Sequence, residues 1–153
     1  MFHLVLLEPE IPHNAGAAGR LALATGSTLH LVEPFGFSLD DKQVRRAGLD
    51  YWNEVKLRVW KSLGAIQEAA DASARFWFLS TKAKRSAWEV EFRPGDYLVF
   101  GRETKGLPES LIEREAESTL RIPMVPGGTR SLNLSTAVAI VVYEAIRQQG
   151  VDW

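Results

Sequence analysis

The sequence predicts an α/β fold, with a mostly parallel sheet flanked by helices. Short apolar runs typical of strands alternate with segments typical of helices along the whole chain. Glycine-rich turns follow several of these runs, where open α/β sheets bind ligands beyond the carboxyl ends of their strands. The 153 residues suffice for one domain with a sizeable core but not for two, so we expect a single domain over residues 1–153.

The first half of the chain predicts three strands and three helices. Residues 2–7 are apolar, with no basic leader and no cleavage site, so they predict a strand rather than a targeting segment. A helix is expected over residues 15–25, with Asn14 as its N-cap and Gly26 in a left-handed conformation at its end. The remaining elements are strands at 28–32 and 55–60, and helices at 40–46 and 63–72.

The second half predicts three more strands and two helices. The strands are expected at residues 75–79, 97–100 and 119–122. Pro108 suits the first turn of a helix that ends near Glu115. The last helix, residues 134–148, is apolar nearly all round over 137–143, which predicts burial on more than one side.

Composition narrows the class of protein. Apolar residues make up 46% and charged residues 24%, the balance of a soluble globular protein, and no apolar run approaches the roughly 20 residues that span a bilayer. There is no cysteine, and the three histidines are too scattered in the sequence to suggest a metal site. The net charge of −1 argues against binding nucleic acid over the whole surface but allows a local basic patch. We therefore expect a cytoplasmic protein without a membrane span or a metal.

The first glycine-rich segment is Asn14-Ala-Gly16-Ala-Ala-Gly19-Arg20. Its glycines allow close packing at the start of a helix, and Arg20, nearly two turns after Asn14, is expected on the same side as Asn14. One interpretation is a capped helix with a solvated arginine. The other is an arginine that meets a phosphate or a reacting hydroxyl, because its planar fork suits oxyanions.

The second segment is Gly101-Arg-Glu103-Thr-Lys-Gly106-Leu107-Pro108. Gly101 at a strand end lets a ligand approach the main chain, Glu103 projects from the turn, and Gly106 is expected to have a positive φ. A plain strand-to-helix turn fits these residues equally well. The phosphate-cradling P-loop pattern and the dinucleotide Gly-x-Gly-x-x-Gly pattern are both missing.

The third segment runs from Ile122-Pro-Met124 to Ser131-Leu-Asn133-Leu-Ser135. Its prolines favour an extended chain, and polar side chains gather where the last helix begins. They form either a helix N-cap or the rim of a pocket. In a pocket, the main chain of Ile122 and Met124 would hold an adenine edge between apolar side chains.

Together the three segments resemble the signature motifs of the SPOUT methyltransferases, the α/β-knot class. The match is closest to a short stand-alone branch, similar to the tRNA (cytidine/uridine) 2′-O-methyltransferases that act at the anticodon wobble nucleotide. It extends over nearly the whole chain, through Glu8-Pro-Glu-Ile-Pro12, Asp41-Lys-Gln-Val-Arg45-Arg46-Ala-Gly48-Leu-Asp50-Tyr51 and Arg121-Ile-Pro-Met-Val-Pro126. The resemblance implies a Rossmann-like fold with a C-terminal trefoil knot, a homodimer, S-adenosylmethionine as cofactor and tRNA as partner.

The resemblance also implies roles for individual residues. Arg20 matches the family's catalytic arginine, and Asn14, Glu103, Ser131 and Asn133 match its supporting polar residues. Cofactor contacts are implied at Leu79, Ser80, Gly101, Ile122, Met124, Ser131 and Leu132. Two positions depart from the family pattern: Ala15, where threonine is common, and Arg102, where proline or a small residue is common.

Methyl transfer to a ribose hydroxyl is an in-line displacement whose barrier lies in alignment and in handling the hydroxyl proton. A guanidinium is a poor general base because it stays protonated. We therefore expect Arg20 to orient the ribose or a phosphate and to stabilise the developing alkoxide. Loss of a proton from Arg20 is the alternative.

Charged and aromatic residues offer candidate RNA contacts. Three basic clusters could either be solvated surface charge or contact RNA phosphates. They are Lys42, Arg45 and Arg46; Lys82, Lys84 and Arg85; and Arg102 and Lys105. Base stacking is a role for Tyr51, Trp52 or Trp88, with core or dimer packing as the alternative for the two tryptophans. The functions considered are methylation of the wobble ribose of tRNA or of another tRNA or rRNA site, a non-catalytic RNA-binding dimer, and a flavodoxin-like nucleotide-binding enzyme.

Overall fold

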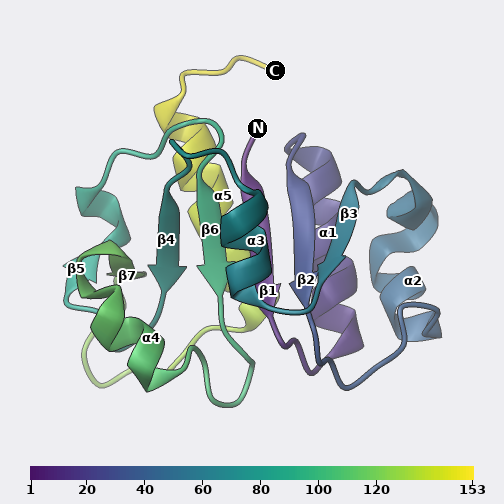
Figure 1. Ribbon diagram of the computed structural model, residues 1–153, viewed down its shortest axis with the longest axis horizontal. Coiled ribbons are helices and arrows are strands. Elements are labelled where there is room, and N and C mark those ends of the chain that lie inside the picture. The colour runs from purple at the N-terminus through teal and green to yellow at the C-terminus, as the bar shows by residue number, and fades with distance from the viewer.

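A seven-stranded sheet runs through the middle of the molecule, and each strand pairs in parallel with its neighbours (Figure 1). The computed structural model describes residues 1–47 and 51–153 in full, and the side chains of 48–50 lie outside the described part. In this part the strands are β1 (His3–Leu7), β2 (Thr28–Val32), β3 (Leu57–Trp60), β4 (Phe76–Leu79), β5 (Arg85–Ser86), β6 (Tyr97–Phe100) and β7 (Thr119–Arg121). Their order across the sheet is β3-β2-β1-β6-β4-β7-β5.

Helices cover both faces of this sheet (Figure 1). The α-helices are α1 (Pro12–Ala24), α2 (Lys42–Gly48), α3 (Leu63–Ala69), α4 (Glu109–Arg114) and α5 (Leu134–Gln148), and the 3-10 helices are η1 (Leu49–Glu54), η2 (Ala87–Glu89) and η3 (Ala116–Ser118). In Figure 1, α3 lies in front of the sheet, whereas α1 and α5 lie behind it. The predicted α/β fold with a parallel sheet is confirmed.

The two faces of β1 explain why its sequence is apolar without alternation. Leu4 and Leu6 belong to a core that includes α1 and α5, whereas Val5 and Leu7 belong to a second core that includes Ile66 of α3. A central parallel strand is buried on both faces, so each of its residues must be apolar.

The start of α1 differs from the prediction. The helix begins at Pro12 rather than at residue 15, and its N-cap is Ile11, which makes no side-chain capping bond. Proline is well suited to this first position because its missing N–H would be unpaired there anyway. Asn14 is therefore not an N-cap but a buried side chain in the first turn.

Other elements were predicted closely. Gly26 has the expected positive φ of 63°, and α5 has the expected bounds, with Asn133 as its N-cap. The two-residue strand β5 and the 3-10 helices were missed. The trefoil knot of the C-terminal third stays a prediction of the family resemblance. Within the described residues, no helix combines the length and apolar character that crossing a membrane requires.

Candidate active site

A cavity of about 560 Å³ lies at the carboxyl ends of the strands. Its walls are the segments that follow β4, β6 and β7, together with the beginnings of α1 and α5. The lining residues are Ile11, Asn14, Leu79, Ser80, Thr81, Lys82, Phe100, Gly101, Arg102, Glu103, Thr104, Lys105, Gly106, Leu107, Ile112, Ile122, Met124, Arg130, Ser131, Leu132, Asn133, Leu134 and Ala137. The volume is that of a site for a drug-sized ligand or cofactor.

The cavity gathers segments that are far apart in the sequence. Ten of the eleven site residues expected from the sequence line it, and they come from the first, second and third glycine-rich segments and from the end of β4. These ten are Asn14, Leu79, Ser80, Gly101, Glu103, Ile122, Met124, Ser131, Leu132 and Asn133. The three segments therefore form one composite site.

Arg20 is the exception. Its side chain is exposed on α1 and does not line the cavity of its own chain. The expectation that Arg20 and Asn14 share one side of the helix was wrong, because six residues at about 100° each place them roughly 120° apart.

Asn14 is held by the far end of the chain and retains one free donor. Its Oδ1 accepts a hydrogen bond of 3.2 Å from Nδ2 of Asn133, whose own Oδ1 caps α5 by accepting from Ser135 N and Thr136 N. Asn14 is only 2% exposed, and its Nδ2 has no hydrogen-bond partner among the described residues. A buried donor without a partner costs about 1–3 kcal/mol, so a ligand oxygen in this cavity would relieve that cost.

Glu103 is engaged by the main chain ahead of α1. Its carboxylate accepts hydrogen bonds from the N–H groups of Glu10 and Ile11. Glu103 therefore joins the loop after β6 to the loop after β1.

Gly101 has a reason to be glycine in addition to the ligand approach expected from the sequence. A Cβ on Gly101 would lie 2.2 Å from the carbonyl carbon of Gly106 and 2.2 Å from the nitrogen of Leu107. The chain folds back on itself there, since Arg102 and Gly106 exchange main-chain hydrogen bonds of 3.3 and 2.9 Å. Close approach of its own chain requires the glycine. The predicted positive φ of Gly106 is confirmed at 65°.

The segment after β7 forms part of the cavity wall. Ile122 and Met124 of this segment line the cavity, so their main-chain N–H and C=O groups lie beside it. Apolar side chains such as Leu79, Phe100 and Leu132 lie in the same lining. This combination suits a flat heterocycle, with polar main-chain groups at its edge and apolar contacts on its faces.

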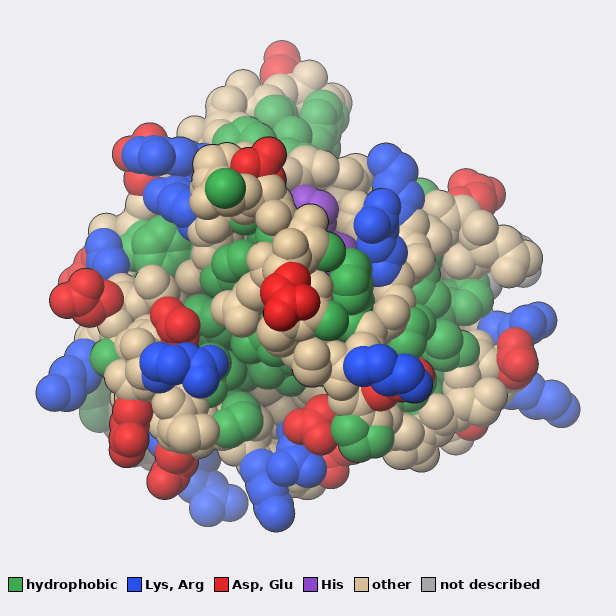
Figure 2. Space-filling model, viewed as in Figure 1, with side chains coloured by type: hydrophobic (Ala, Val, Ile, Leu, Met, Phe, Trp, Pro, Cys, Tyr) green, Lys and Arg blue, Asp and Glu red, His purple; other side chains and the backbone are tan. Residues whose placement is uncertain are grey.

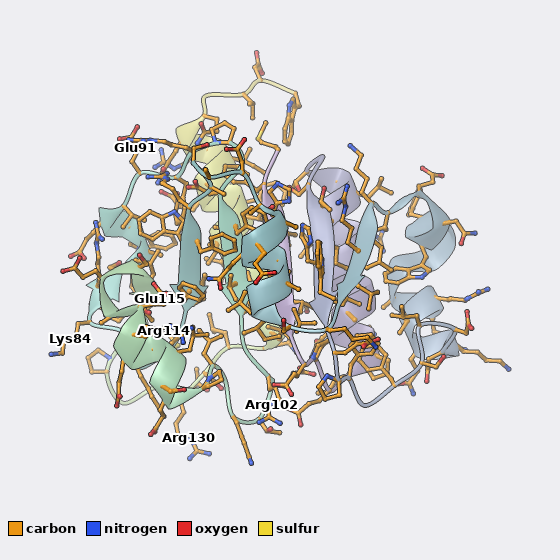
Figure 3. The ribbon with its side chains drawn as sticks, viewed as in Figure 1. Lys84, Glu91, Arg102, Arg114, Glu115 and Arg130 are labelled. Carbon is orange, nitrogen blue, oxygen red and sulfur yellow. The ribbon has the colours of Figure 1, made fainter. Side chains whose placement is uncertain are left out.

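Basic side chains surround the mouth of the cavity. Lys82, Arg102 and Lys105 are in its lining, as is Arg130, which the sequence analysis missed although it directly precedes Ser131. In Figure 3, Arg102 and Arg130 both lie at the end of the molecule where the carboxyl ends of the strands are found. Figure 2 shows basic side chains along this edge, mixed with acidic ones.

Some candidate RNA contacts have structural roles. Lys82 pairs with Glu109 at 3.0 Å, and Arg85 donates a hydrogen bond to the carbonyl of Glu117. Trp52 packs against the core, where a Cβ on Gly19 would lie 2.5 Å from its ring. The packing alternative therefore holds for Trp52.

Exposed candidates for RNA contact remain on the surface. Tyr51 is 46% exposed and Trp88 is 49% exposed, so either ring is accessible to a base. The segment that carries Tyr51 also includes residues 48–50, whose side chains lie outside the described part.

Two histidines that the sequence separates are neighbours in the fold. His3 Nδ1 lies 2.9 Å from His30 Nε2, although the two residues are 27 positions apart in the sequence. They lie on β1 and β2, His3 at the amino end of its strand, whereas the cavity is at the carboxyl ends. Among the described residues, no group of three or more metal-ligating side chains is present.

Known proteins share both this sequence and this fold. The chain is 49% identical over 154 residues to the tRNA (cytidine(34)-2′-O)-methyltransferase of Burkholderia pseudomallei (strain 1106a), which covers 99% of this chain and 98% of that relative. It is 48% identical over 151 residues to the tRNA (cytidine(34)-2′-O)-methyltransferase of Escherichia coli (strain K12), and the match covers 98% of this chain and 95% of that relative. A solved structure that gave structural insights into the 2-OH methylation of C/U34 on tRNA matches with a TM-score of 0.93 at 50% identity. The match covers 98% of this chain and 97% of that one. The SpoU rRNA Methylase family matches residues 1–143, and the chain therefore belongs to this family.

Proposed function

We propose that this protein transfers a methyl group from S-adenosylmethionine to the 2′-oxygen of a tRNA ribose, at the wobble nucleotide 34. One observation carries the proposal: three distant segments converge on a single cavity in a methylase-family chain. The relatives that are nearly half identical over almost the whole chain are named as methyltransferases of that nucleotide. We place the protein in the cytoplasm, with its tRNA substrate.

The cavity fits S-adenosylmethionine. The main-chain groups of Ile122 and Met124 in the cavity lining suit the adenine edge, and the neighbouring apolar side chains suit its faces. Ser131 and Asn14, whose Nδ2 is unpartnered among the described residues, add polar side chains to the lining. When bound, this cofactor supplies an electrophilic methyl group on a positively charged sulfur.

The residues of the chain have the task of aligning the ribose. Asn14 Nδ2 is a donor for a ligand oxygen, and Asn133 fixes its orientation. Arg102 and Arg130 at the mouth are suited to RNA phosphates, because a guanidinium binds phosphate through a planar fork. Holding the reactants in line accounts for several kcal/mol of the barrier.

A homodimer would supply the missing arginine. Arg20 is exposed on α1, which packs beside α5, and the outward side of α5 exposes Tyr143 by 46% and leaves Ile140 half-buried. The sequence predicted a helix buried on more than one side, and association through α1 and α5 would complete that burial. We propose that Arg20 of the partner subunit then reaches the cavity, where it orients the ribose and stabilises the developing alkoxide.

The experiment is to map 2′-O-methylated ribose in tRNA from cells with and without this protein. We expect the modification at nucleotide 34 to disappear without the protein and to return with the wild-type gene, but not with Arg20→Ala. If the methylation that disappears is instead at another tRNA or rRNA nucleotide, that nucleotide is the substrate and nucleotide 34 is not. An unchanged methylation pattern would favour a non-catalytic RNA-binding dimer and contradict the proposal.

A further inference from the structure

Two loops at the rim of the cavity are joined by reciprocal hydrogen bonds, in which a carboxylate of each loop accepts from the other loop. Glu103, on the loop after β6, accepts hydrogen bonds from the main-chain N–H of Glu10 at 3.0 Å and of Ile11 at 2.5 Å. In return, Oε1 of Glu10 accepts from the main-chain N–H of Thr104 at 3.1 Å and from its hydroxyl at 2.8 Å. We call these four residues, Glu10, Ile11, Glu103 and Thr104, the carboxylate clasp.

The clasp holds the chain just ahead of α1. The N-cap Ile11 makes no side-chain capping bond, Pro12 has no N–H, and the N–H groups of Asn14 and Ala15 donate to the carbonyl of Ile11. Glu103 accepts from the N–H groups of Glu10 and Ile11, which precede the helix, from a segment more than 90 residues away, and its negative charge lies at the positive end of the helix dipole. Each carboxylate therefore acts as an acceptor for N–H groups of the opposite loop.

The clasp also determines where Asn14 lies. Asn14 is in the first turn of α1, three residues after Ile11; it belongs to the cavity lining, and its buried Nδ2 has no partner among the described residues. A shift of the N-terminus of α1 relative to the β6 loop would move this donor away from the loop that carries Gly101. A displacement of about 1 Å is enough to lower turnover by as much as a hundredfold.

We propose that Glu10 and Thr104 are positioning residues for methyl transfer, and that Glu103 acts with them rather than as a proton acceptor. The proposal rests on the methyltransferase function stated above. Both Glu103 oxygens are occupied by main-chain donors, so the carboxylate holds the two loops in register. Glu10 joins the same two loops by accepting from Thr104 of the β6 loop.

The test compares Glu10→Gln, Glu103→Gln and the double variant in methyl transfer to tRNA. Each amide retains an acceptor oxygen but presents N–H groups to the donors of the opposite loop. We expect each single variant to lower kcat by about tenfold or more, with the double variant little worse than the singles, because both changes break one unit. The KM for tRNA should change little, and the pH profile of kcat should keep its shape. Thr104→Val, which loses the hydroxyl alone, should give a smaller loss.

Glu113→Gln is the matched control, because Glu113 is exposed on α4 and lies outside both the clasp and the cavity lining. It should retain wild-type turnover. Thermal unfolding of every variant identifies any loss of turnover that comes from an unfolded protein and not from misplaced loops.

Two results would overturn the proposal while wild-type activity stands. One is wild-type turnover in folded Glu10→Gln. The other is a loss of transfer in Glu103→Gln far greater than in Glu10→Gln, with residual activity whose pH profile lacks one limb, as expected of a proton acceptor. Absence of methyl transfer in the wild-type protein would instead contradict the proposed function, so the two failures are distinguishable.

Discussion

Asn14 is a buried polar side chain at the cavity whose donor group is left without a partner. It is 2% exposed, yet its amide Nδ2 has no hydrogen-bond partner among the described residues. Native proteins pair nearly all such groups, and the exceptions tend to have a functional reason. The nearby Asn133 fixes the other end of the amide, so the free donor has a defined direction.

Arg20 gives the residue-scale prediction for catalysis. Arg20→Ala should lower methyl transfer by about 100-fold or more, as for loss of a group that stabilises developing charge. Arg20→Lys should also be strongly impaired, because it keeps the charge but loses the planar fork. The measurement is single-turnover transfer to tRNA.

Binding of S-adenosylhomocysteine is the control for both Arg20 variants. The affinity should stay within about twofold of wild type, because the proposed contacts of Arg20 are with the ribose of the tRNA and not with the cofactor. Near-normal turnover in Arg20→Lys would contradict the orienting role.

The histidine pair predicts a pH-dependent stability. Trp60 Nε1 donates to His30 Nδ1, so the His30 proton is on Nε2 and is donated to His3. Burial, followed by the proximity of His3 and Arg58, lowers the pKa of His30 to about 4, and burial also lowers the pKa of His3. Because the unfolded chain binds protons more readily between about pH 4 and 6.5, the free energy of unfolding should fall as pH falls through this window, by up to about 3 kcal/mol.

Chemical denaturation across that pH range is the measurement, with His30→Gln and His13→Gln as variants. His30→Gln should flatten the pH dependence, and His13→Gln should leave it unchanged, since His13 is exposed. An equal slope in wild type and His30→Gln would contradict this account.

Single residues also show where sequence interpretation fails. The resemblance identified ten residues that the structure brings around one cavity. It could not identify the partners of Glu103, because hydrogen bonds between residues 92 and 93 positions apart leave no local pattern. Nor did Arg130 carry a recognisable signal beyond its place next to the third glycine-rich segment.

At the scale of elements, the loop after β6 is shaped by backbone contact. The chain from Gly101 folds back onto Gly106 and Leu107, and this reversal presents Glu103 to α1. Gly101→Ala would place a methyl group within the main chain, and some atoms would have to move. We expect a loss of at least about 2 kcal/mol in the free energy of unfolding, together with weaker cofactor binding.

Gly64→Ala is the control for Gly101→Ala. Gly64 is exposed in α3, and its added Cβ would meet only Ser62 Oγ at 3.7 Å, an ordinary contact. This variant should be unchanged or more stable by about 0.5–1 kcal/mol, because alanine favours helix. Equal stabilities of the two variants, measured by thermal and chemical unfolding, would show that the close approach at Gly101 is unimportant.

Local sequence predicted the long elements and missed the short ones. The apolar strands near the middle of the sheet and the 15-residue α5 have strong patterns, and their predicted bounds are close to the observed ones. β5 has only two residues, Arg85 and Ser86, and exists because β7 pairs with it. The early start of α1 was missed because its N-cap, Ile11, has no capping side chain to mark it, although Pro12 suits the first helical position.

At the scale of the whole molecule, the outward side of α5 is the feature that a single chain leaves incomplete. Tyr143 is 46% exposed there, beside residues that are only half-buried. If two chains associate through α1 and α5, Tyr143→Glu should place a charge in the interface and produce a monomer. Analytical ultracentrifugation of both proteins is the measurement.

The monomeric variant should also separate binding from chemistry. It should bind S-adenosylhomocysteine but transfer no methyl group, because Arg20 of the partner subunit would be absent. Val59→Glu, on the edge strand β3, is the control for a new surface charge and should remain a dimer. A monomeric wild-type protein with full activity would contradict the proposed dimer.

The most direct test of the central claim, that loops at the carboxyl ends of the sheet form one methyl-donor site, is calorimetric titration with S-adenosylhomocysteine. We predict one binding site per chain in the wild-type protein. Ala137→Phe, which fills the cavity from α5, should lower the affinity at least about tenfold while the fold remains intact. Equal binding to both proteins, or no binding to the wild type, would contradict the claim.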